Sequence, residues 1–279
     1  MENNAAKIKE ELAESGRRIE ERMKRIGRKF VILSNKGGVG KTTVSVQLAS
    51  ILAAGGASVG LLDADIHGPS TVKAMGMEGI RLKNGADNSI LPLEKGNLKL
   101  ISVGSMLAGS DAPLIWRGPM KSNLIRQFLA DVEWGDLDYL IIDSPPGTGD
   151  EPMSIFQMIP GITGAVIVTT PQDIALLDSR KCVGFLREMG IPAAGIIENM
   201  SGLLCPSCGE EIEVFGKGGG EKAAKEFGIP FLGRIKLDPL VMSSMDRGID
   251  YISENPDSPT ALSLKKIAER ITGKGAEDE

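Results

Sequence analysis

The feature that most constrains this chain is a glycine-rich segment placed between an apolar run and a helix-like run. The segment Ser34–Thr43 reads SNKGGVGKTT, and it directly follows the apolar run Phe30–Leu33. In such a loop the glycines let several backbone N–H groups face one anion, and the following helix adds the positive end of its dipole. Because strand, loop and helix occur in the order that phosphate binding requires, the sequence predicts a phosphate-binding loop.

Two side chains of this loop have predicted roles in binding a nucleotide. Lys41 should reach the β and γ phosphates, and Thr42 should place its hydroxyl on Mg²⁺. Asn35 stands where the usual pattern has a glycine, and a chance glycine-rich turn is the alternative interpretation. The residues expected to bind the nucleotide are Gly37, Gly38, Val39, Gly40, Lys41, Thr42 and Thr43.

A second lysine, Lys36, lies two residues before Gly38 and has no evident role within a single phosphate loop. It could be a solvated loop cation. The loop resembles that of the deviant phosphate-loop ATPases, which include nitrogenase iron proteins and the MinD and ParA partitioning ATPases. In that class the corresponding lysine reaches the nucleotide of a dimer partner. The resemblance implies a homodimer with ATP at the subunit interface, in which Lys36 and Lys41 are catalytic residues.

The rest of the chain alternates apolar runs with helix-length segments. Several runs are continuously apolar, which is typical of strands covered on both faces, so we expect a mostly parallel β-sheet with helices on both faces. This is the α/β architecture of a P-loop NTPase, in which ligands bind outside the carboxyl ends of the strands. The expected strands are Phe30–Ser34, Ser58–Asp63, Leu98–Val103, Asp138–Asp143, Ala165–Thr169, Ala193–Glu198 and Phe231–Ile235.

The second expected strand ends in two carboxylates. Asp63 and Asp65 alternate there, just before a Gly-Pro turn. By resemblance to the switch I segment of the ATPase class, Asp65 would position the attacking water and act as a catalytic residue, while Asp63 would support the Mg²⁺ or its surroundings. Ordinary capping of the strand end is the alternative for both residues.

A further carboxylate follows the apolar run Leu140–Ile142. This is the Walker B arrangement, so Asp143 is expected to hold Mg²⁺ directly or through water. The next segment, Ser144–Asp150, carries a Pro-Pro pair and a Gly-Thr-Gly stretch and is similar to a switch II loop. Its Gly147 amide could sense the γ-phosphate. A simple turn between strand and helix is the alternative.

The chain has three cysteines. Cys182 has apolar neighbours in the helix-like run Asp173–Met189, which favours a buried packing thiol. Cys205 and Cys208 form a Cys-X-X-Cys pair in a loop, and two thiolates at this spacing can share one metal centre. Two copies of the pair across a twofold axis would give four sulfurs, enough for a bridging 4Fe-4S cluster or one Zn²⁺. A redox dithiol or a structural role remains an alternative.

Six segments together resemble the Mrp/ApbC family of iron-sulfur cluster carrier ATPases, and the likeness spans about residues 28 to 255. They are the phosphate loop, Asp63–Ser70, Trp116–Met120, Pro145–Asp150, Glu198–Ser201 and the Cys205/Cys208 pair.

This resemblance implies a homodimer that holds a labile 4Fe-4S cluster between its subunits, receives it from a cluster donor and transfers it to apo-proteins with slow ATP hydrolysis. It also implies that Asn199, at a strand end, contacts adenine, with the turn that contains Asp238 nearby. The Trp116–Met120 segment has no physical explanation from the sequence.

Composition and charge argue against a nucleic-acid-binding protein and against a membrane protein. A formal net charge of −5 argues against a general nucleic-acid binder, and no apolar run approaches the ~20 residues needed to cross a bilayer. We therefore expect a cytoplasmic protein with no membrane or nucleic-acid partner. A MinD/ParA-like positioning ATPase and an ATP-dependent electron donor are the alternative functions, the second disfavoured because Ser144–Asp150 contains no cysteine.

The expected organisation has three parts. Residues 1–27 form a charged surface helix with a narrow apolar stripe of Ile8, Leu12, Ile19 and Met23, which could instead contact a partner. Residues 28–272 form the P-loop ATPase domain, with the metal loop at about 200–218. Residues 273–279 form a low-complexity tail that is expected to be disordered.

Overall fold

A computed structural model describes residues 2–66, 70–86, 89–106, 118–172, 174–205 and 207–273. Trp116 and Arg117 of the family-like segment, Asp173 of the predicted cysteine-bearing helix, and residues 274–279 of the predicted tail lie outside the described residues. Among the residues that the structure describes, no helix is long and apolar enough to span a bilayer.

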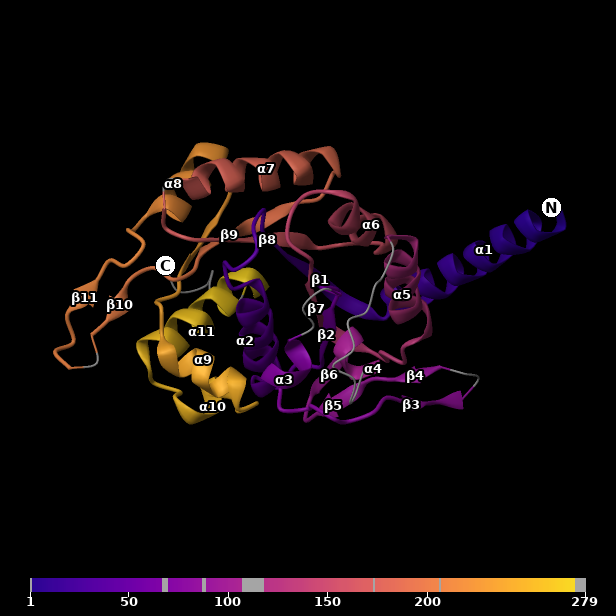
Figure 1. The fold of residues 1–279 in the computed structure, drawn as a ribbon, viewed down its shortest axis with the longest axis horizontal. Helices are drawn as coiled ribbons and strands as arrows, with labels where there is room; N and C mark the ends of the chain where they lie inside the picture. Colours follow the sequence, from indigo (N-terminus) through magenta and orange to yellow (C-terminus); the bar gives the residue numbers. More distant parts are fainter. Residues whose placement is uncertain are drawn as a thin grey trace.

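A central sheet organises the described part of the chain (Figure 1). Its eight strands lie in the order β12-β9-β8-β1-β7-β2-β6-β5, and every neighbouring pair is parallel except β5 with β6 at one edge. The predicted mostly parallel sheet is confirmed. The strands are β1 (Ile26–Leu33), β2 (Val59–Asp63), β5 (Leu93–Lys95), β6 (Leu98–Ser102), β7 (Leu137–Asp143), β8 (Gly164–Thr169), β9 (Ala193–Glu198) and β12 (Phe231–Arg234).

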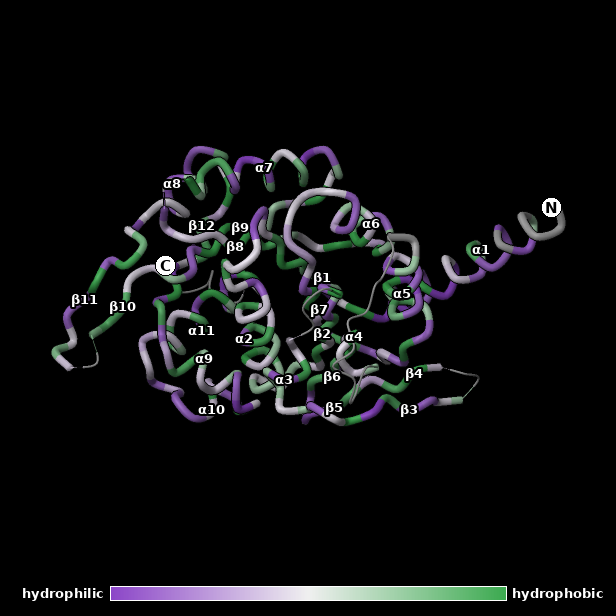
Figure 2. The backbone as a smooth tube through the Cα atoms, in the orientation of Figure 1, coloured by the Kyte–Doolittle hydropathy of each residue, from purple (hydrophilic) through white to green (hydrophobic). Residues whose placement is uncertain are grey.

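Successive side chains of a strand point to opposite faces of the sheet. Because the buried strands are apolar on both faces, helices cover each face and close one core on each side. In β1, Val31 and Leu33 face one core, whereas Phe30 and Ile32 face the other. Figure 2 shows the green, apolar strands at the centre of the molecule. The first core is closed by α1 (Glu2–Lys24), α5 (Gly118–Asp131), α6 (Asp150–Met158), α7 (Ile174–Glu188) and α8 (Gly219–Phe227). The second is closed by α2 (Lys41–Ala54), α3 (Thr71–Ala74), α9 (Pro239–Asp246), α10 (Tyr251–Glu254) and α11 (Pro259–Thr272).

The N-terminal helix is present, as predicted, and most of its described side chains are exposed. It ends at Lys24, and Ile26 already belongs to β1. Ile19 and Met23 are buried in the first core, while Leu12 is exposed and the start of α1 extends away from the body of the molecule (Figure 1). The helix therefore lies on the surface and packs the C-terminal part of its predicted apolar stripe on the core. The division of the chain at residue 27 stays a prediction.

Two short antiparallel ribbons lie outside the main sheet. Strands β3 (Lys83–Asn84) and β4 (Ile90–Leu91) form one, and β10 (Leu203–Leu204) and β11 (Glu211–Ile212) form the other. The sequence did not predict either ribbon. The second one projects from the body of the molecule beside α8 and α9 (Figure 1), and it carries Cys205 and Cys208 between its strands. A short helix, α4 (Val103–Met106), follows β6.

Candidate functional site: a phosphate loop and a cysteine hairpin

The phosphate loop connects the carboxyl end of β1 to the start of α2, as predicted. Gly38 and Gly40 have positive φ angles of 77° and 88°, a conformation that side chains disfavour. A Cβ built on Gly37 or Gly38 would meet nothing within 4 Å, and no side chain among the described residues caps α2. The first N–H groups of α2 and the open face of the loop therefore form a cradle that fits an anion such as a phosphate.

The predicted magnesium ligands lie together beside this cradle. The Thr42 hydroxyl donates a 2.6 Å hydrogen bond to Oδ2 of Asp143, at the end of β7. Ser45, which sequence reasoning missed, donates to Oδ1 of the same carboxylate at 3.0 Å. A hydroxyl and a carboxylate are oxygen ligands of the kind that Mg²⁺ prefers. These residues fit the ion. Burial raises the pKa of Asp143, and the charge of Lys41, buried at the start of α2, opposes that rise.

Asp63 and Asp143 are register partners on neighbouring parallel strands. Burial raises the pKa of both groups, and at Asp63 repulsion from the Asp143 carboxylate raises the pKa further. Asp63 accepts hydrogen bonds from the hydroxyls of Thr71 at 2.7 Å and Ser102 at 2.9 Å, and from the backbone N–H of Asp65 at 3.1 Å. Its oxygens thus fix the start of the segment that carries Asp65. A direct metal contact of Asp63 and the water-positioning role of Asp65 stay predictions.

The switch II-like segment touches the phosphate loop directly. The backbone N–H of Gly147, whose φ is 101°, donates a 2.8 Å hydrogen bond to the carbonyl of Ser34. The Ser144 hydroxyl donates to the carbonyl of Ile32 at 2.7 Å. The segment predicted to respond to the γ-phosphate is therefore hydrogen-bonded to the strand and loop that would hold that phosphate.

Lys36 is paired within its own chain. Its Nζ lies 2.8 Å from Oδ2 of Asp178 on α7, and the side-chain amide of Asn35 donates to Oδ1 of Asp178 at 2.7 Å. Asp178 thus holds two successive residues at the entry of the loop. The structure leaves the predicted contact of Lys36 with a partner's nucleotide untested.

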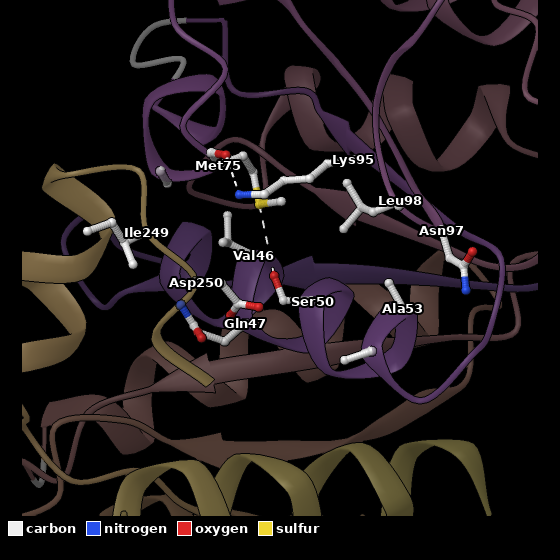
Figure 3. Close-up of a pocket in the computed structure, with 13 residues that line it drawn as sticks. Val46, Gln47, Ser50, Ala53, Met75, Lys95, Asn97, Leu98, Ile249 and Asp250 are labelled. Carbon is white, nitrogen blue, oxygen red and sulfur yellow. Dashed lines mark hydrogen bonds between the residues drawn. The ribbon is translucent and has the colours of Figure 1, made fainter. Parts of the chain in front are cut away.

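A cavity of about 330 Å³ lies between the phosphate loop, the end of β8 and α7, and it is lined in part by Lys36, Asp178 and Cys182. Cys182 is fully buried, which confirms the predicted packing thiol, and burial raises its pKa to about 12. A separate cavity of about 190 Å³ lies between α2, the end of α3 and the β5–β6 turn (Figure 3). Its lining includes Ser50 and Lys95, and it contains none of the predicted site residues.

Asn199, at the end of β9, packs against the phosphate loop. Its side-chain amide donates a 2.8 Å hydrogen bond to the carbonyl of Val39. A Cβ built on Gly40 would lie 2.2 Å from Nδ2 of Asn199, so only glycine fits there. Asp238 caps α9 by accepting from the N–H of Leu240, and it also accepts from the hydroxyl of Tyr251. The adenine contacts expected for Asn199 and Asp238 stay predictions.

The cysteine hairpin begins four residues after Asn199, with β10 at Leu203. Cys205 donates its backbone N–H to the carbonyl of Glu210, and Gly209 donates to the carbonyl of Cys205, both at 2.9 Å. Hydrogen bonds from the backbone at Cys208 and Ser207 lower the pKa of the half-buried Cys205 thiol. Cys208 is exposed. The described residues contain no cluster of three or more histidine, cysteine or acidic side chains arranged to hold a metal ion, so this hairpin offers two sulfurs per chain.

A buried carboxylate, Glu198, anchors the base of this hairpin. It accepts hydrogen bonds from the Ser201 hydroxyl at 2.6 Å and from the N–H groups of Gly218 at 3.0 Å and Gly220 at 2.7 Å, and it pairs with Arg234 at 3.2 Å. Burial opposes ionisation, but these hydrogen bonds prevail and lower the pKa of Glu198. This anchor was not predicted from the sequence, and the only signal near it is the family-like Glu198–Ser201 segment.

The parallel sheet, the phosphate loop between β1 and α2 and the carboxylate at the end of β7 define a P-loop NTPase. Residues 25–272 match the family model of ParA-type proteins described as NUBPL iron-transfer P-loop NTPases. The chain belongs to this family, which confirms the resemblance to iron-sulfur carrier ATPases and the expectation of a nucleoside triphosphatase.

Curated relatives and solved structures agree with this assignment. The chain is 48% identical over 272 residues to the iron-sulfur cluster carrier protein of Methanocaldococcus jannaschii, covering 98% of this chain and 93% of the relative. It is 42% identical to the iron-sulfur cluster carrier protein of Saccharolobus solfataricus, covering 95% and 90%.

A nucleotide-binding protein from Archaeoglobus fulgidus, solved in complex with ADP and with cobalt, is 34% identical with a TM-score of 0.77, covering 88% of this chain and 95% of that one. The septum site-determining protein MinD of Pyrococcus horikoshii, complexed with Mg-ADP, has a TM-score of 0.65 at 22% identity, covering 90% and 98%. This second likeness supports the fold alone.

Proposed function

We propose that this protein binds and slowly hydrolyses ATP with Mg²⁺, and that its homodimer carries a 4Fe-4S cluster that it passes to apo-proteins. The observation that carries the proposal is the position of Cys205 and Cys208 on one projecting hairpin, with Cys208 exposed. A 4Fe-4S cluster takes four thiolates, and two hairpins supply that number when a second copy is present. Relatives over nearly the whole chain are named iron-sulfur cluster carrier proteins.

The nucleotide half of the proposal rests on the cradle at α2. Backbone N–H groups of the loop and Lys41 would bind the phosphates, while Thr42 and Asp143 would hold the Mg²⁺. When bound, the ion supplies charge neutralisation for the transferred phosphoryl group. Asp65 would orient the attacking water, and Asn199, with Asp238 nearby, would contact the adenine. The ADP complex of the Archaeoglobus fulgidus protein supports a nucleotide at this place.

The dimer half of the proposal assigns Lys36 to the nucleotide of the partner subunit. Lys36 is half exposed at the loop entry, so its side chain can reach outward once it leaves Asp178. The partners are then a second copy of the chain, a cluster donor and the apo-proteins that accept the cluster. We place the protein in the cytoplasm, where reduced thiols and ATP are both available.

The test is anaerobic reconstitution with iron and sulfide, followed by absorbance, metal and sulfide counts and measurement of the molecular mass. The samples are the wild type, Cys205→Ala and Cys208→Ala, with Ser207→Ala as a matched control in the same loop. We expect a chromophore with about four irons per dimer in the wild type and the control, and none in the cysteine variants. Zinc alone, or no metal, in the wild type would overturn the cluster proposal and favour a positioning ATPase.

A further inference from the structure

The phosphate loop and the cysteine hairpin of one subunit are joined by the four-residue segment Glu198–Ser201. At one end of the segment, Nδ2 of Asn199 donates to the carbonyl of Val39. The close fit between Asn199 and Gly40 leaves no gap between the loop and this side chain. A movement of the loop at Val39 or Gly40 must therefore move Asn199 or break its hydrogen bond.

At the other end, the segment is fastened to the base of the hairpin. The Ser201 N–H donates to the carbonyl of Ile235 at 2.9 Å, and the N–H of Leu237 donates to the carbonyl of Gly202 at 2.8 Å. A Cβ built on Gly202 would lie 2.9 Å from Oε1 of Glu211, so the first residue beyond the segment packs directly on strand β11. A displacement at Ser201 is thereby passed to both strands that flank the cysteines.

Glu211 also ties the hairpin to the body of the protein. Its carboxylate lies 3.0 Å from Nζ of Lys217 and 2.8 Å from Nζ of Lys236. Both pairs are partly exposed, and such pairs are weak and easily exchanged. The hairpin is therefore held by contacts that a small shift at its base can rearrange.

Met200 lies between these two ends in a strained conformation. Its φ of 59° is the one positive φ of a non-glycine residue in the part of the chain that the structure describes. A side chain disfavours this region, so the surrounding contacts hold the Met200 backbone in a conformation of higher energy than one with negative φ. The hydrogen bonds of Asn199 and Ser201 hold Met200 from both sides, so a shift at either end changes the force on this strained residue.

We infer that nucleotide occupancy of the phosphate loop changes the conformation of the cysteine hairpin within the same subunit, with Asn199 and Met200 as the positioning residues. The inference rests on the proposed function, because it describes how the nucleotide would regulate the hold on the cargo. It needs no partner subunit, since every contact in the path lies within one chain. Nucleotide and hairpin states must then influence each other by the same factor.

The experiment is hydrogen exchange, read by mass spectrometry, on the full-length protein without metal, with and without saturating ADP and Mg²⁺. The reporters are the N–H groups of Cys205 and Gly209, whose hydrogen bonds close the hairpin. We expect ADP to change their exchange rates by about fivefold or more, the lower end of common coupling strengths. The same change is expected in Lys36→Ala, which lacks the lysine assigned to the dimer contact.

Three further variants test whether the effect passes through Asn199 and Met200, and ADP binding to each variant is confirmed by titration. Asn199→Ala also loses the proposed adenine contact, so it is measured at an ADP concentration that saturates the variant, and its hairpin should then not change. Met200→Gly should show a reduced response because glycine adopts both signs of φ freely. Asn97→Ala, an exposed asparagine on the β5–β6 turn, should respond like the wild type.

An unchanged hairpin in ADP-bound wild type, a full response in Asn199→Ala, or a response lost in Lys36→Ala would each overturn the inference. Because the readout uses protein without metal, failure of cluster reconstitution would leave this result unaffected.

Discussion

Lys36 and Asp178 form an ion pair of 2.8 Å across the entry of the phosphate loop. The lysine proposed to act on a partner's nucleotide is thus held by its own chain, and the two contacts compete for one ammonium group. The same carboxylate also accepts from Asn35. Dimerisation through Lys36 must therefore release a contact that stabilises the single subunit.

Asp178→Asn should strengthen ATP-dependent dimerisation. The substitution removes the competing charge, and a partly exposed pair is worth up to about 1 kcal/mol, so we expect roughly a fivefold gain per subunit. Sedimentation velocity with ATP and Mg²⁺ measures the association constant. Glu188→Gln, an exposed position on the same helix, is the control and should leave dimerisation unchanged. Weaker association in Asp178→Asn would mean that the carboxylate supports the dimer instead.

Lys41→Ala should weaken nucleotide binding. A hydrogen bond to a charged group contributes about 1.5 to 3 kcal/mol, so the affinity for ADP should fall roughly tenfold to a hundredfold. Calorimetric titration gives the affinity, and Lys225→Ala, on the exposed face of α8, should bind ADP as the wild type does. Equal affinities in the two variants would remove Lys41 from the site.

The strands and the nucleotide-binding loop could be predicted because their signals are local. A continuous apolar run such as Leu140–Ile142 identifies a buried strand, and SNKGGVGKTT identifies its loop wherever the rest of the chain lies. Asp178 could not be predicted, since its position beside Lys36 depends on how α7 packs on the sheet. The two strands of the cysteine hairpin have only two residues each, which is too short for a hydrophobic periodicity, so they could not be predicted either.

Asp143→Asn should make ADP binding insensitive to magnesium. In the wild type, removing Mg²⁺ with a chelator should lower the affinity for ADP, because the Thr42 and Asp143 oxygens would hold the ion against the phosphates. The amide of the variant is a poor ligand for Mg²⁺, so its affinity should be the same with and without the ion. Asp257→Asn, at an exposed position, should keep the magnesium response. A response retained by Asp143→Asn would place the ion elsewhere.

Glu198→Gln should destabilise the protein at neutral pH. The amide replaces one accepting oxygen with a donor that faces other donors, such as the N–H of Gly220, so we expect a loss of about 2 kcal/mol. The folded-state pKa of Glu198 lies below its usual value, so its contribution is complete above about pH 4.5 and is lost as the pH falls through the folded-state pKa.

Urea denaturation at pH 7 and at acidic pH measures both effects of Glu198→Gln. The wild type should lose more stability than the variant on acidification, and Glu78→Gln, an exposed control, should follow the wild type. Parallel pH profiles for wild type and Glu198→Gln would show that the carboxylate makes no net contribution.

Met23→Ala should destabilise the protein because the end of α1 belongs to the core. Met23 is 1% exposed and packs with Ile19 among residues of α5, and both residues belong to the apolar stripe predicted from the sequence. Truncating a buried methionine costs about 2 to 5 kcal/mol, so the midpoint of urea denaturation should fall clearly. Leu12→Ala, on the same helix but 44% exposed, should change the stability by less than about 0.5 kcal/mol. If both substitutions had equally small effects on the free energy of unfolding, Met23 would contribute no more to the core than Leu12 does.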